Sequence, residues 1–351
     1  MLESLQIRDF TVFAKADFEF GKGLNIIVGT NGTGKSHVLK LGYAMGVAST
    51  GITRLRQDNQ PEFMLLAPVQ RTLRSVFQVS DFWALKRNQD KGEVSVDVTY
   101  SKPEVRLGIT LSGIAVNEVV SSSFRNSSAQ LTTAPIFIPA KEVLSFYEGF
   151  AALYRKYNLA FDQTYLDLCE ALSGPTLREP GPGTQAVLTT LERIMQGRVA
   201  LEGGRFYLYP SQGERREINL AAEGIRKFAT LAQLLANGSL SPQTILFWDE
   251  PEANLNPALL KELAKLLFTL AGQGFQIILA THSLFLLKEF YILSQNETNS
   301  IRYFGLFQGL NGATQVETTD DFEILEHITA LDAELEQTVD FQQALDRDDA
   351  N

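Results

Sequence analysis

The chain of 351 residues has a single cysteine and no long apolar run. Its one cysteine, Cys169, excludes an intramolecular disulfide and a cysteine cluster for zinc, so we expect a buried core thiol. No stretch of about 18 apolar residues is present, which excludes a transmembrane helix. The start MLESLQIRDF carries acids where a signal peptide has apolar residues. These absences predict a soluble cytoplasmic protein without a membrane partner.

Negative charge is concentrated at the carboxyl end. The formal net charge is −10, and from Val316 to Asn351 there are 12 Asp and Glu against one basic residue, Arg347. That segment carries −11, which leaves +1 for the other 315 residues. We expect a solvated tail helix there, or an acidic contact for a basic partner. The nearly neutral remainder neither favours nor excludes nucleic-acid binding.

A phosphate-binding pattern occurs early, in the stretch LNIIVGTNGTGKSHVLKLGYAMG. An apolar strand over Leu24 to Val28 precedes the spacing G-x-x-x-x-G-K-S, which begins at Gly29, and a helix-like segment follows. Glycines let backbone N–H groups curl towards phosphate oxygens, and the helix presents its positive end. Lys35 can reach the β- and γ-phosphates, and Ser36 offers a hydroxyl to Mg²⁺. The predicted nucleotide contacts in this stretch are Asn31, Gly32, Gly34, Lys35, Ser36 and His37.

Paired acids follow a second buried strand, in TILFWDEPEANLNP. Ile245 to Trp248 read as the strand, and Asp249 and Glu250 follow at once. Two adjacent carboxylates at the end of a buried strand are costly unless a nearby group uses their charge. In a phosphate-binding site the first carboxylate holds Mg²⁺ with Ser36, and the second can orient the attacking water. We therefore predict Asp249 as a metal-site residue and Glu250 as a catalytic one.

A third strand, Phe275 to Ala280, ends at the polar triplet Thr-His-Ser. Ligands of α/β sheets bind at the carboxyl ends of parallel strands, which is where His282 and Asp249 are both expected. His282 is therefore predicted to hydrogen-bond the γ-phosphate or the attacking water. The imidazole of His37, although inside the phosphate-binding stretch, is given no chemical role.

Together these stretches resemble an ATP-binding cassette (ABC) ATPase of the SMC, Rad50, RecF and OLD-like branch. The resemblance covers residues 1–45 and 215–295, and its motifs are LESLQIRDFTVFAKADFEFGKGLNIIVGTNGTGKS, FWDEPEANLNP and ATHS. It implies ATP and Mg²⁺ as cofactors and ATP hydrolysis. It also implies a homodimer, or a higher homo-oligomer, in which a signature loop of one subunit grips the γ-phosphate held by the other.

The signature loop implied by the resemblance is assigned to NLAAEGIRKFATLAQLLANG, where Gly224 would approach the partner's phosphate. A rival stretch, SQGER at 211–215, lies too far upstream of Asp249. Ala222 stands where the family usually has a serine, and Asn256 where many members have an aspartate. Because a lost hydroxyl contact to a charged group costs roughly 1.5–3 kcal/mol, we expect slow turnover or a weak ATP-bound dimer.

The expected fold is an α/β P-loop ATPase head with a mixed β-sheet, a helical subdomain and an α/β insertion. Its predicted segments are 1–50 with 199–310 for the head, 51–198 for the insertion and 311–351 for an acidic tail. The insertion shows no sustained heptad, so a long coiled coil is excluded. The glutamine that senses the γ-phosphate in the family is left open between Gln57, Gln70 and Gln78.

Two functions are compatible with these motifs. In the first, a regulatory ATPase controls a separately encoded effector, a nuclease or toxin, as in two-gene bacterial antiphage modules. The 69 residues after His282 leave little room for the Toprim nuclease domain of an OLD protein, so the effector is expected on another chain. In the second, the chain is a RecF-like DNA-repair ATPase that binds DNA when ATP is bound. A transport ATPase fits less well, because of the RDF opening and the altered signature.

Overall fold

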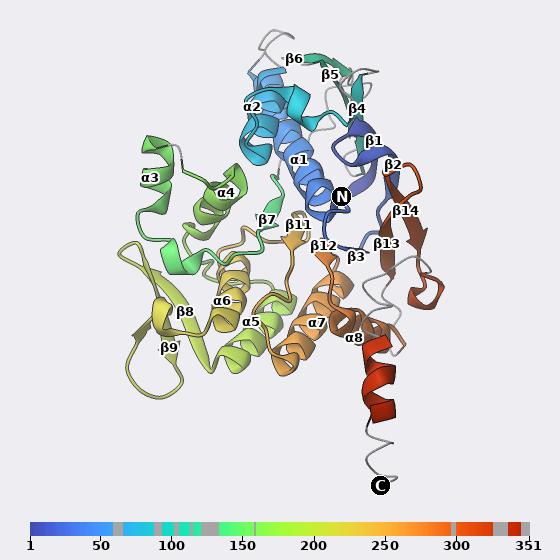
Figure 1. Ribbon diagram of the computed structural model, residues 1–351. Coiled ribbons are helices and arrows are strands. Elements are labelled where there is room, and N and C mark those ends of the chain that lie inside the picture. Colours follow the sequence, from blue (N-terminus) through green and yellow to red (C-terminus); the bar gives the residue numbers. More distant parts are fainter. Residues whose placement is uncertain are drawn as a thin grey trace.

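The computed structural model describes residues 1–58, 66–87, 93–101, 105–112, 115–120, 133–157, 159–295, 300–325 and 336–344. Two large sheets enclose a long helix, α1 (Lys35–Gln57), and further helices cover the outer face of one sheet (Figure 1). The predicted α/β P-loop architecture with a mixed sheet is confirmed.

The central sheet places the predicted site residues together at the carboxyl ends of its parallel strands. Its order is β14 (Thr314–Thr319), β13 (Ile301–Gln308), β3 (Leu24–Gly29), β12 (Gln276–Thr281), β11 (Ile245–Asp249) and β7 (Ile136–Ile138). All neighbours are parallel except β13 and β14. Buried on both faces, β3, β11 and β12 read as continuous apolar runs. The register pairs Asp249 with Ala280 and Thr281 with Val28, so the loops after these three strands emerge together.

The second sheet is antiparallel throughout and packs along α1. Its order is β2 (Phe13–Glu19), β1 (Leu2–Phe10), β4 (Val94–Tyr100), β5 (Val105–Ser112) and β6 (Ala115–Val120). Alternating side chains of β2 point inward, as its buried Ala16 and Phe18 show. Phe18 packs on Phe304 of β13 with ring centroids 5.4 Å apart, which joins the two sheets in one core.

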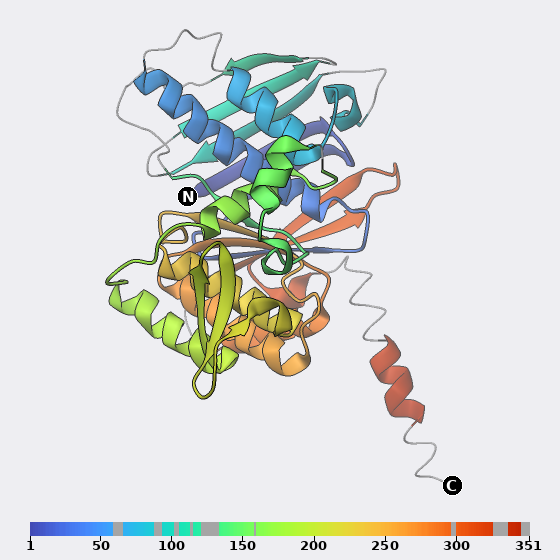
Figure 2. The same cartoon turned by 90° about the vertical axis from the view of Figure 1, so that its left-hand side faces the viewer.

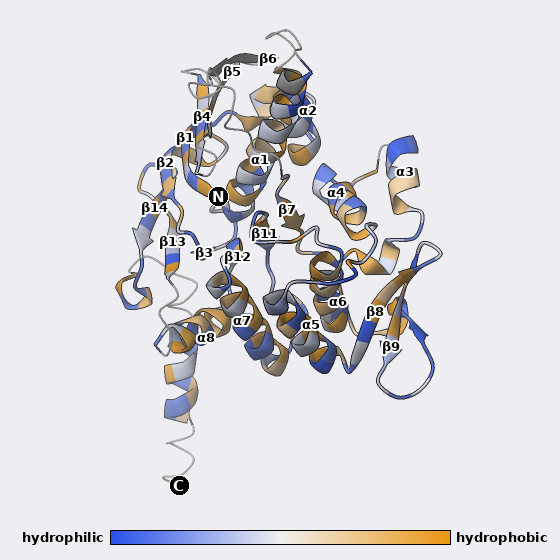
Figure 3. Cartoon of the chain, turned by 180° about the vertical axis from the view of Figure 1, so that it is seen from behind, coloured by the Kyte–Doolittle hydropathy of each residue, from blue (hydrophilic) through white to orange (hydrophobic). Residues whose placement is uncertain are grey.

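Helices cover both faces of the central sheet. On one face lies α1, with α2 (Leu66–Phe77) packed against α1 and β6; on the other lie α5 (Pro182–Met195), α6 (Glu223–Ala236), α7 (Pro257–Gly272) and α8 (Leu284–Ser294). Figure 3, coloured by hydropathy, shows apolar and polar residues interspersed along α5 to α7, as expected for helices that bury one side. Within the described residues, no helix combines the length and apolar content that crossing a membrane requires.

A smaller layer of short elements surrounds α6. It comprises α3 (Phe150–Lys156), α4 (Gln163–Leu172) and a three-stranded sheet of β8 (Gly197–Glu202), β9 (Arg205–Pro210) and β10 (Arg216–Glu217). The helix α4 is tied to α1, because Lys40 Nζ lies 2.7 Å from Asp162 Oδ2 and the Tyr43 hydroxyl donates to Asp167 at 2.6 Å. Cys169 on α4 is buried as expected, and burial raises the pKa of its thiol to about 12.

Strand pairing connects the predicted segments to one another. Within 51–198, β4 pairs with β1 and β7 pairs with β11, so this segment contributes to both sheets. The segment 311–351 begins with β14, which forms the edge of the central sheet beside β13. Residues 336–344 form a helix with every residue exposed (Figure 2). The division into three domains remains a prediction.

Candidate nucleotide site

The loop 30–34 joins β3 to α1 in the form that a phosphate-binding loop needs. Gly32 and Gly34 have φ of +83° and +93°, a left-handed conformation that glycine adopts without strain. At Gly34 a Cβ would also lie 2.6 Å from a methyl group of Val12. At Gly29 a Cβ would lie 2.5 Å from the carbonyl oxygen of Leu306 on β13. These three glycines are therefore required by backbone conformation or by close packing.

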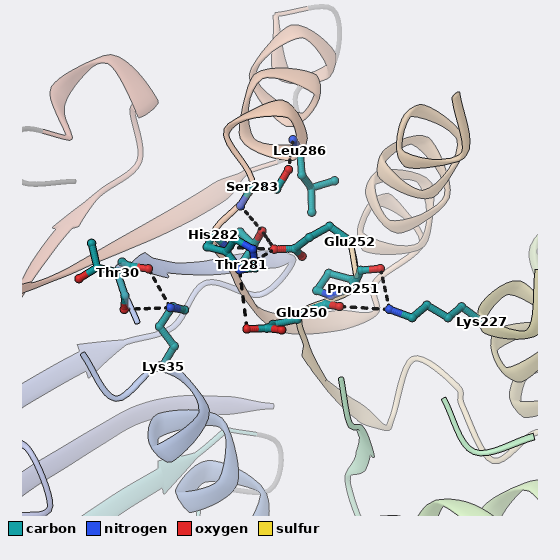
Figure 4. A network of polar contacts seen from close by, with 11 residues as sticks. Thr30, Lys35, Lys227, Glu250, Pro251, Glu252, Thr281, His282, Ser283 and Leu286 are labelled. Carbon is teal, nitrogen blue, oxygen red and sulfur yellow. Dashed lines mark hydrogen bonds and ion pairs between the residues drawn. The ribbon is translucent and has the colours of Figure 1, made fainter. Parts of the chain in front are cut away.

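Lys35 starts α1 and is buried, with its ammonium folded over the loop. Its Nζ donates to the carbonyl oxygens of Gly29 at 2.7 Å and Thr30 at 3.1 Å (Figure 4). Burial lowers the pKa of Lys35, and the carboxylates of Glu250 and Asp249 oppose that shift. The acids at the end of β11 are therefore close enough to act on this ammonium, as the two motifs predicted.

Asp249 is the last residue of β11, beside the amino-terminal end of α1. Burial raises the pKa of its carboxyl, whereas a contact with the Ser36 hydroxyl lowers it. Its Oδ1 atom is buried and has no hydrogen-bond partner within the part of the chain that is described. A buried carboxylate oxygen without a partner, next to a serine hydroxyl, fits the oxygen-ligand chemistry of Mg²⁺.

The charges around Asp249 also favour a cation. Three acids in the segment 249–252 face the buried ammonium groups of Lys35 and Lys227. The nearby Lys40 is paired with Asp162. The excess of carboxylates over buried ammonium groups is the arrangement that a bound divalent ion offsets.

Glu250 and His282 approach each other across the ends of β11 and β12. Glu250 has φ of +47°, which is uncommon for a residue with a side chain, and its N–H donates to Ala280 at 2.9 Å. His282 Nδ1 lies 3.7 Å from Glu250 Oε1, and the imidazole is about half exposed. In Figure 4 Glu250 lies between Lys35 on one side and Lys227 on the other. The structure thus brings together Lys35, Ser36, Asp249, Glu250 and His282.

Gly224 lies in a different environment, at the start of α6. The three atoms nearest to where its Cβ would stand belong to Leu255, Leu259 and Asn254, the closest at 2.7 Å. The missing side chain is thus explained by packing within the chain. Ala222, the residue before α6, is exposed and provides no side-chain cap. The helix start presents backbone rather than a hydroxyl group.

Two sequence features near Gly224 gain a physical explanation. The rival stretch 211–215 forms the turn between β9 and β10, where Gly213 has φ of +100°, and so does not start a helix. Asn256 caps α7, because its side chain accepts from the N–H of Leu259 at 2.9 Å. Asparagine and aspartate cap helices about equally well, so the asparagine here keeps that role.

The remaining predicted residues are less closely connected to this cluster. Asn31 is exposed on the loop. His37 contacts the Thr11 hydroxyl at 3.0 Å, and burial lowers the pKa of its imidazole. Of the three candidate glutamines, Gln70 lies in α2 and Gln78 directly after it, whereas the side chain of Gln57 is outside the described residues. The glutamine assignment stays open.

Two functional candidates were missed by sequence reasoning. Glu252 is buried and accepts hydrogen bonds from the Thr281 hydroxyl at 2.6 Å and the His282 N–H at 2.9 Å. Lys227 is buried on α6 and donates to the carbonyl oxygens of Glu250 and Pro251. The position of Glu252, two residues after Glu250, could have marked it as a candidate from sequence. Lys227 lies within the amphipathic helix α6, where no sequence pattern marks it as functional.

Comparison with known families decides the class of the protein. Residues 99–288, more than half of the chain, match the family described as "AAA domain, putative AbiEii toxin, Type IV TA system". The chain belongs to this family. Residues 4–162 also match a family described as "AAA domain". Together with the RecF relatives and the SMC-head structures described next, these matches support an ABC-type ATPase of the SMC and RecF branch.

Curated relatives and solved structures agree with this assignment. The chain is similar to the DNA replication and repair protein RecF of Magnetococcus marinus, 41% identical over 71 residues, 18% of each chain. It is 26% identical to RecF of Pediococcus pentosaceus over 163 residues, 46% of this chain and 37% of the relative. The chain thus spans less than two fifths of the length of these relatives.

Two solved structures share the fold of this AAA-domain protein. One is an SMC head bound to the C-winged helix domain of ScpA, with a TM-score of 0.55 and 16% identity over 92% of this chain and 98% of that one. The other is an Smc head with an extended coiled coil bound to the C-terminal domain of ScpA, from Pyrococcus furiosus. Its TM-score is 0.53 and its identity 13%, over 98% of this chain and 99% of that one. At such identity the likeness concerns the fold alone.

Proposed function

We propose that this ATPase-family chain binds ATP with Mg²⁺ and hydrolyses it. The observation that carries the proposal is the meeting of Lys35, Asp249, Glu250 and His282 at the carboxyl edge of one parallel sheet. The loop before α1 and Lys35 bind the phosphates, while Ser36 and Asp249 hold Mg²⁺, which offsets phosphate charge. Glu250 orients the attacking water, and His282 hydrogen-bonds it or the γ-phosphate.

We also propose that the working unit is a homodimer, in which the start of α6 completes the partner's site. Gly224 packs on Leu255 of its own chain, while Ala222, two residues before it, is exposed. A helix start offers free N–H groups and a positive dipole end to an anion. Backbone groups would then bind the γ-phosphate without the usual serine, and we expect slow turnover.

ATP-dependent closure of this homodimer would control a separately encoded effector, which would be a nuclease or toxin in bacterial antiphage defence. The family description, which names a putative toxin and a toxin–antitoxin system, supports this reading. The helix 336–344 offers a second surface for partner binding. Its Val339 and Phe341 are 54% and 64% exposed, and Glu336 and Asp340 on the same helix are also exposed. An acidic helix with exposed apolar side chains is suited to a basic protein partner.

A second candidate is a RecF-like ATPase that binds DNA in its ATP-bound state. The two RecF matches favour it. One experiment separates the candidates. The Glu250→Gln variant, trapped with ATP, is isolated from its native host and assayed in parallel for duplex DNA binding by fluorescence anisotropy.

A stoichiometric protein partner that is lost in Lys35→Ala supports effector control. ATP-dependent DNA binding without such a partner supports the RecF-like function. If the purified chain hydrolyses no ATP in the presence of Mg²⁺, alone or with its partner, the proposed ATPase activity is wrong.

A further inference from the structure

The loop that carries His282 is held by one buried carboxylate. Glu252 Oε1 accepts from the Thr281 hydroxyl at 2.6 Å and from the N–H of His282 at 2.9 Å. Thr281 Oγ1 in turn accepts from the N–H of Ser283 at 3.0 Å, and Ser283 caps α8. Figure 4 shows these contacts, which connect Glu252 to the turn between β12 and α8.

This carboxylate also faces the imidazole. Glu252 Oε1 lies 3.5 Å from His282 Nδ1, and Glu250 Oε1 lies 3.7 Å from the same nitrogen. The imidazole thus sits between a buried acid and the acid predicted to orient water. Glu252 itself is only 8% exposed, so it contacts the loop and not the solvent.

A buried lysine holds the same turn from the other side. Lys227 Nζ donates to the carbonyl oxygens of Glu250 at 3.2 Å and Pro251 at 3.3 Å. Burial lowers the pKa of Lys227, and Glu252 is the strongest of the acids that oppose this. Lys227 therefore supplies the countercharge that lets Glu252 stay buried beside two other acids.

We propose that Glu252 is the positioning residue for His282: its Oε1 atom fixes the backbone at His282 and so aims the imidazole at the γ-phosphate side of Glu250. The inference rests on the proposed ATP hydrolysis. Both hydrogen bonds to Glu252 Oε1 come from the loop that carries His282, so Glu252 acts through His282. A group displaced by about 1 Å can lose about a hundredfold in rate, so even a partial release of the loop is measurable.

Two substitutions of Glu252 separate the effect of side-chain length from the effect of charge. Glu252→Asp keeps the charge but withdraws the oxygen by one methylene, whereas Glu252→Gln keeps the reach and an accepting carbonyl but loses the charge. We expect Glu252→Asp to lower kcat at least about tenfold with the KM for ATP changed less than about threefold. Glu252→Gln should keep most of kcat, and Glu214→Ala, an exposed acid, should match the parent.

A double substitution tests the route through His282. In the His282→Ala background, Glu252→Asp should lower kcat by less than about twofold more, because residues that act as a unit are not additive. If the two losses multiply, or if Glu252→Gln is as slow as Glu252→Asp, the positioning role is overturned.

An activity-independent readout keeps this inference separate from the proposed function. Amide hydrogen exchange of the segment 281–287, measured without nucleotide, should rise in Glu252→Asp and match the parent in Glu252→Gln. Unchanged exchange in Glu252→Asp would overturn the proposal even if turnover fell. Absence of turnover in the parent would refute the proposed hydrolysis, and the exchange result would still decide whether Glu252 holds the loop.

Discussion

Replacing Asp249 by asparagine should stabilise the nucleotide-free protein while weakening its response to Mg²⁺ and ATP. Burial raises the pKa of Asp249 and the adjacent Glu250 adds to that shift, while contacts with Ser36 and two lysines oppose it. A carboxyl whose pKa is higher in the folded than in the unfolded chain destabilises the fold when ionised. Asparagine has the same shape, carries no charge and retains an oxygen that can accept from Ser36.

The expected gain can be given a magnitude. Single stabilising substitutions commonly contribute about 0.5–2 kcal/mol, and we expect the loss of this unfavourable charge to fall in that range. With an unfolding entropy of about 2.1 cal/mol/K per residue, a change of 1 kcal/mol in the free energy of unfolding shifts the midpoint of thermal unfolding of a chain this size by roughly 1.4 °C. The variant should therefore unfold about 1–3 °C higher near pH 7. The gain should vanish as pH falls through the folded pKa towards the ordinary aspartate value of about 3.9.

Adding Mg²⁺ and ATP should make the parent more stable than Asp249→Asn, the reverse of the order without nucleotide. ATP at about a hundred times its Kd adds about 2.7 kcal/mol to a protein that binds it, or roughly 4 °C here. The parent should gain this in Mg²⁺ and ATP, and Asp249→Asn should gain clearly less. Scanning calorimetry in EDTA and in Mg²⁺ with ATP measures both effects.

A matched control makes the same chemical change at a different carboxylate. Asp162 forms an ion pair with Lys40 at 2.7 Å, so Asp162→Asn should lower the midpoint. The reasoning about Asp249 would be refuted if Asp249→Asn were less stable than the parent in EDTA near pH 7, or if it gained the full ligand shift.

Three further predictions concern other parts of the site. Lys35→Ala should abolish ATP binding in isothermal titration, because the loop loses its phosphate-facing ammonium. Gly224→Ala should change the free energy of unfolding in urea by less than about 1 kcal/mol, since the methyl of Leu255 that would lie 2.7 Å from the new Cβ is a side-chain end that can turn away, and alanine favours the helix more than glycine does. Tyr43→Phe should raise the pKa of Asp167, because the Tyr43 hydroxyl lowers it. The resulting loss of stability in urea, about 1–3 kcal/mol at neutral pH, should shrink at acid pH as that carboxyl is protonated. A Gly224→Ala variant destabilised by more than about 1 kcal/mol, ATP binding by Lys35→Ala or a pH-independent loss in Tyr43→Phe would each contradict its prediction.

Local patterns made the phosphate-binding edge predictable from sequence. The strand before Gly29, the glycine turn and the helix starting at Lys35 are specified by consecutive residues, as are the apolar strands that end at Asp249 and Thr281. Parallel strands share one carboxyl edge, so the meeting of these residues follows once the strands are recognised.

Contacts between distant segments were not predictable in this way. Pairing of β4 with β1 joins residues about ninety positions apart, and no local pattern specifies that partner. The leucine that fills the space at Gly224 comes from the loop after β11. The inward turn of Glu252 depends on the left-handed backbone at Glu250 and on Lys227 of α6. The sequence shows that residue 252 is a glutamate, but the local pattern does not show in which direction its side chain points.

The central claim, a composite ATP site made by two copies of this chain, is tested most directly by sedimentation of Glu250→Gln with Mg²⁺, with and without ATP. Because the substitution removes the residue that orients water and keeps the phosphate loop, ATP should remain bound and unhydrolysed. We expect a shift to a dimer on adding ATP, and none in the Lys35→Ala, Glu250→Gln double variant. An unchanged sedimentation coefficient in Glu250→Gln, with ATP binding shown by titration, would contradict it.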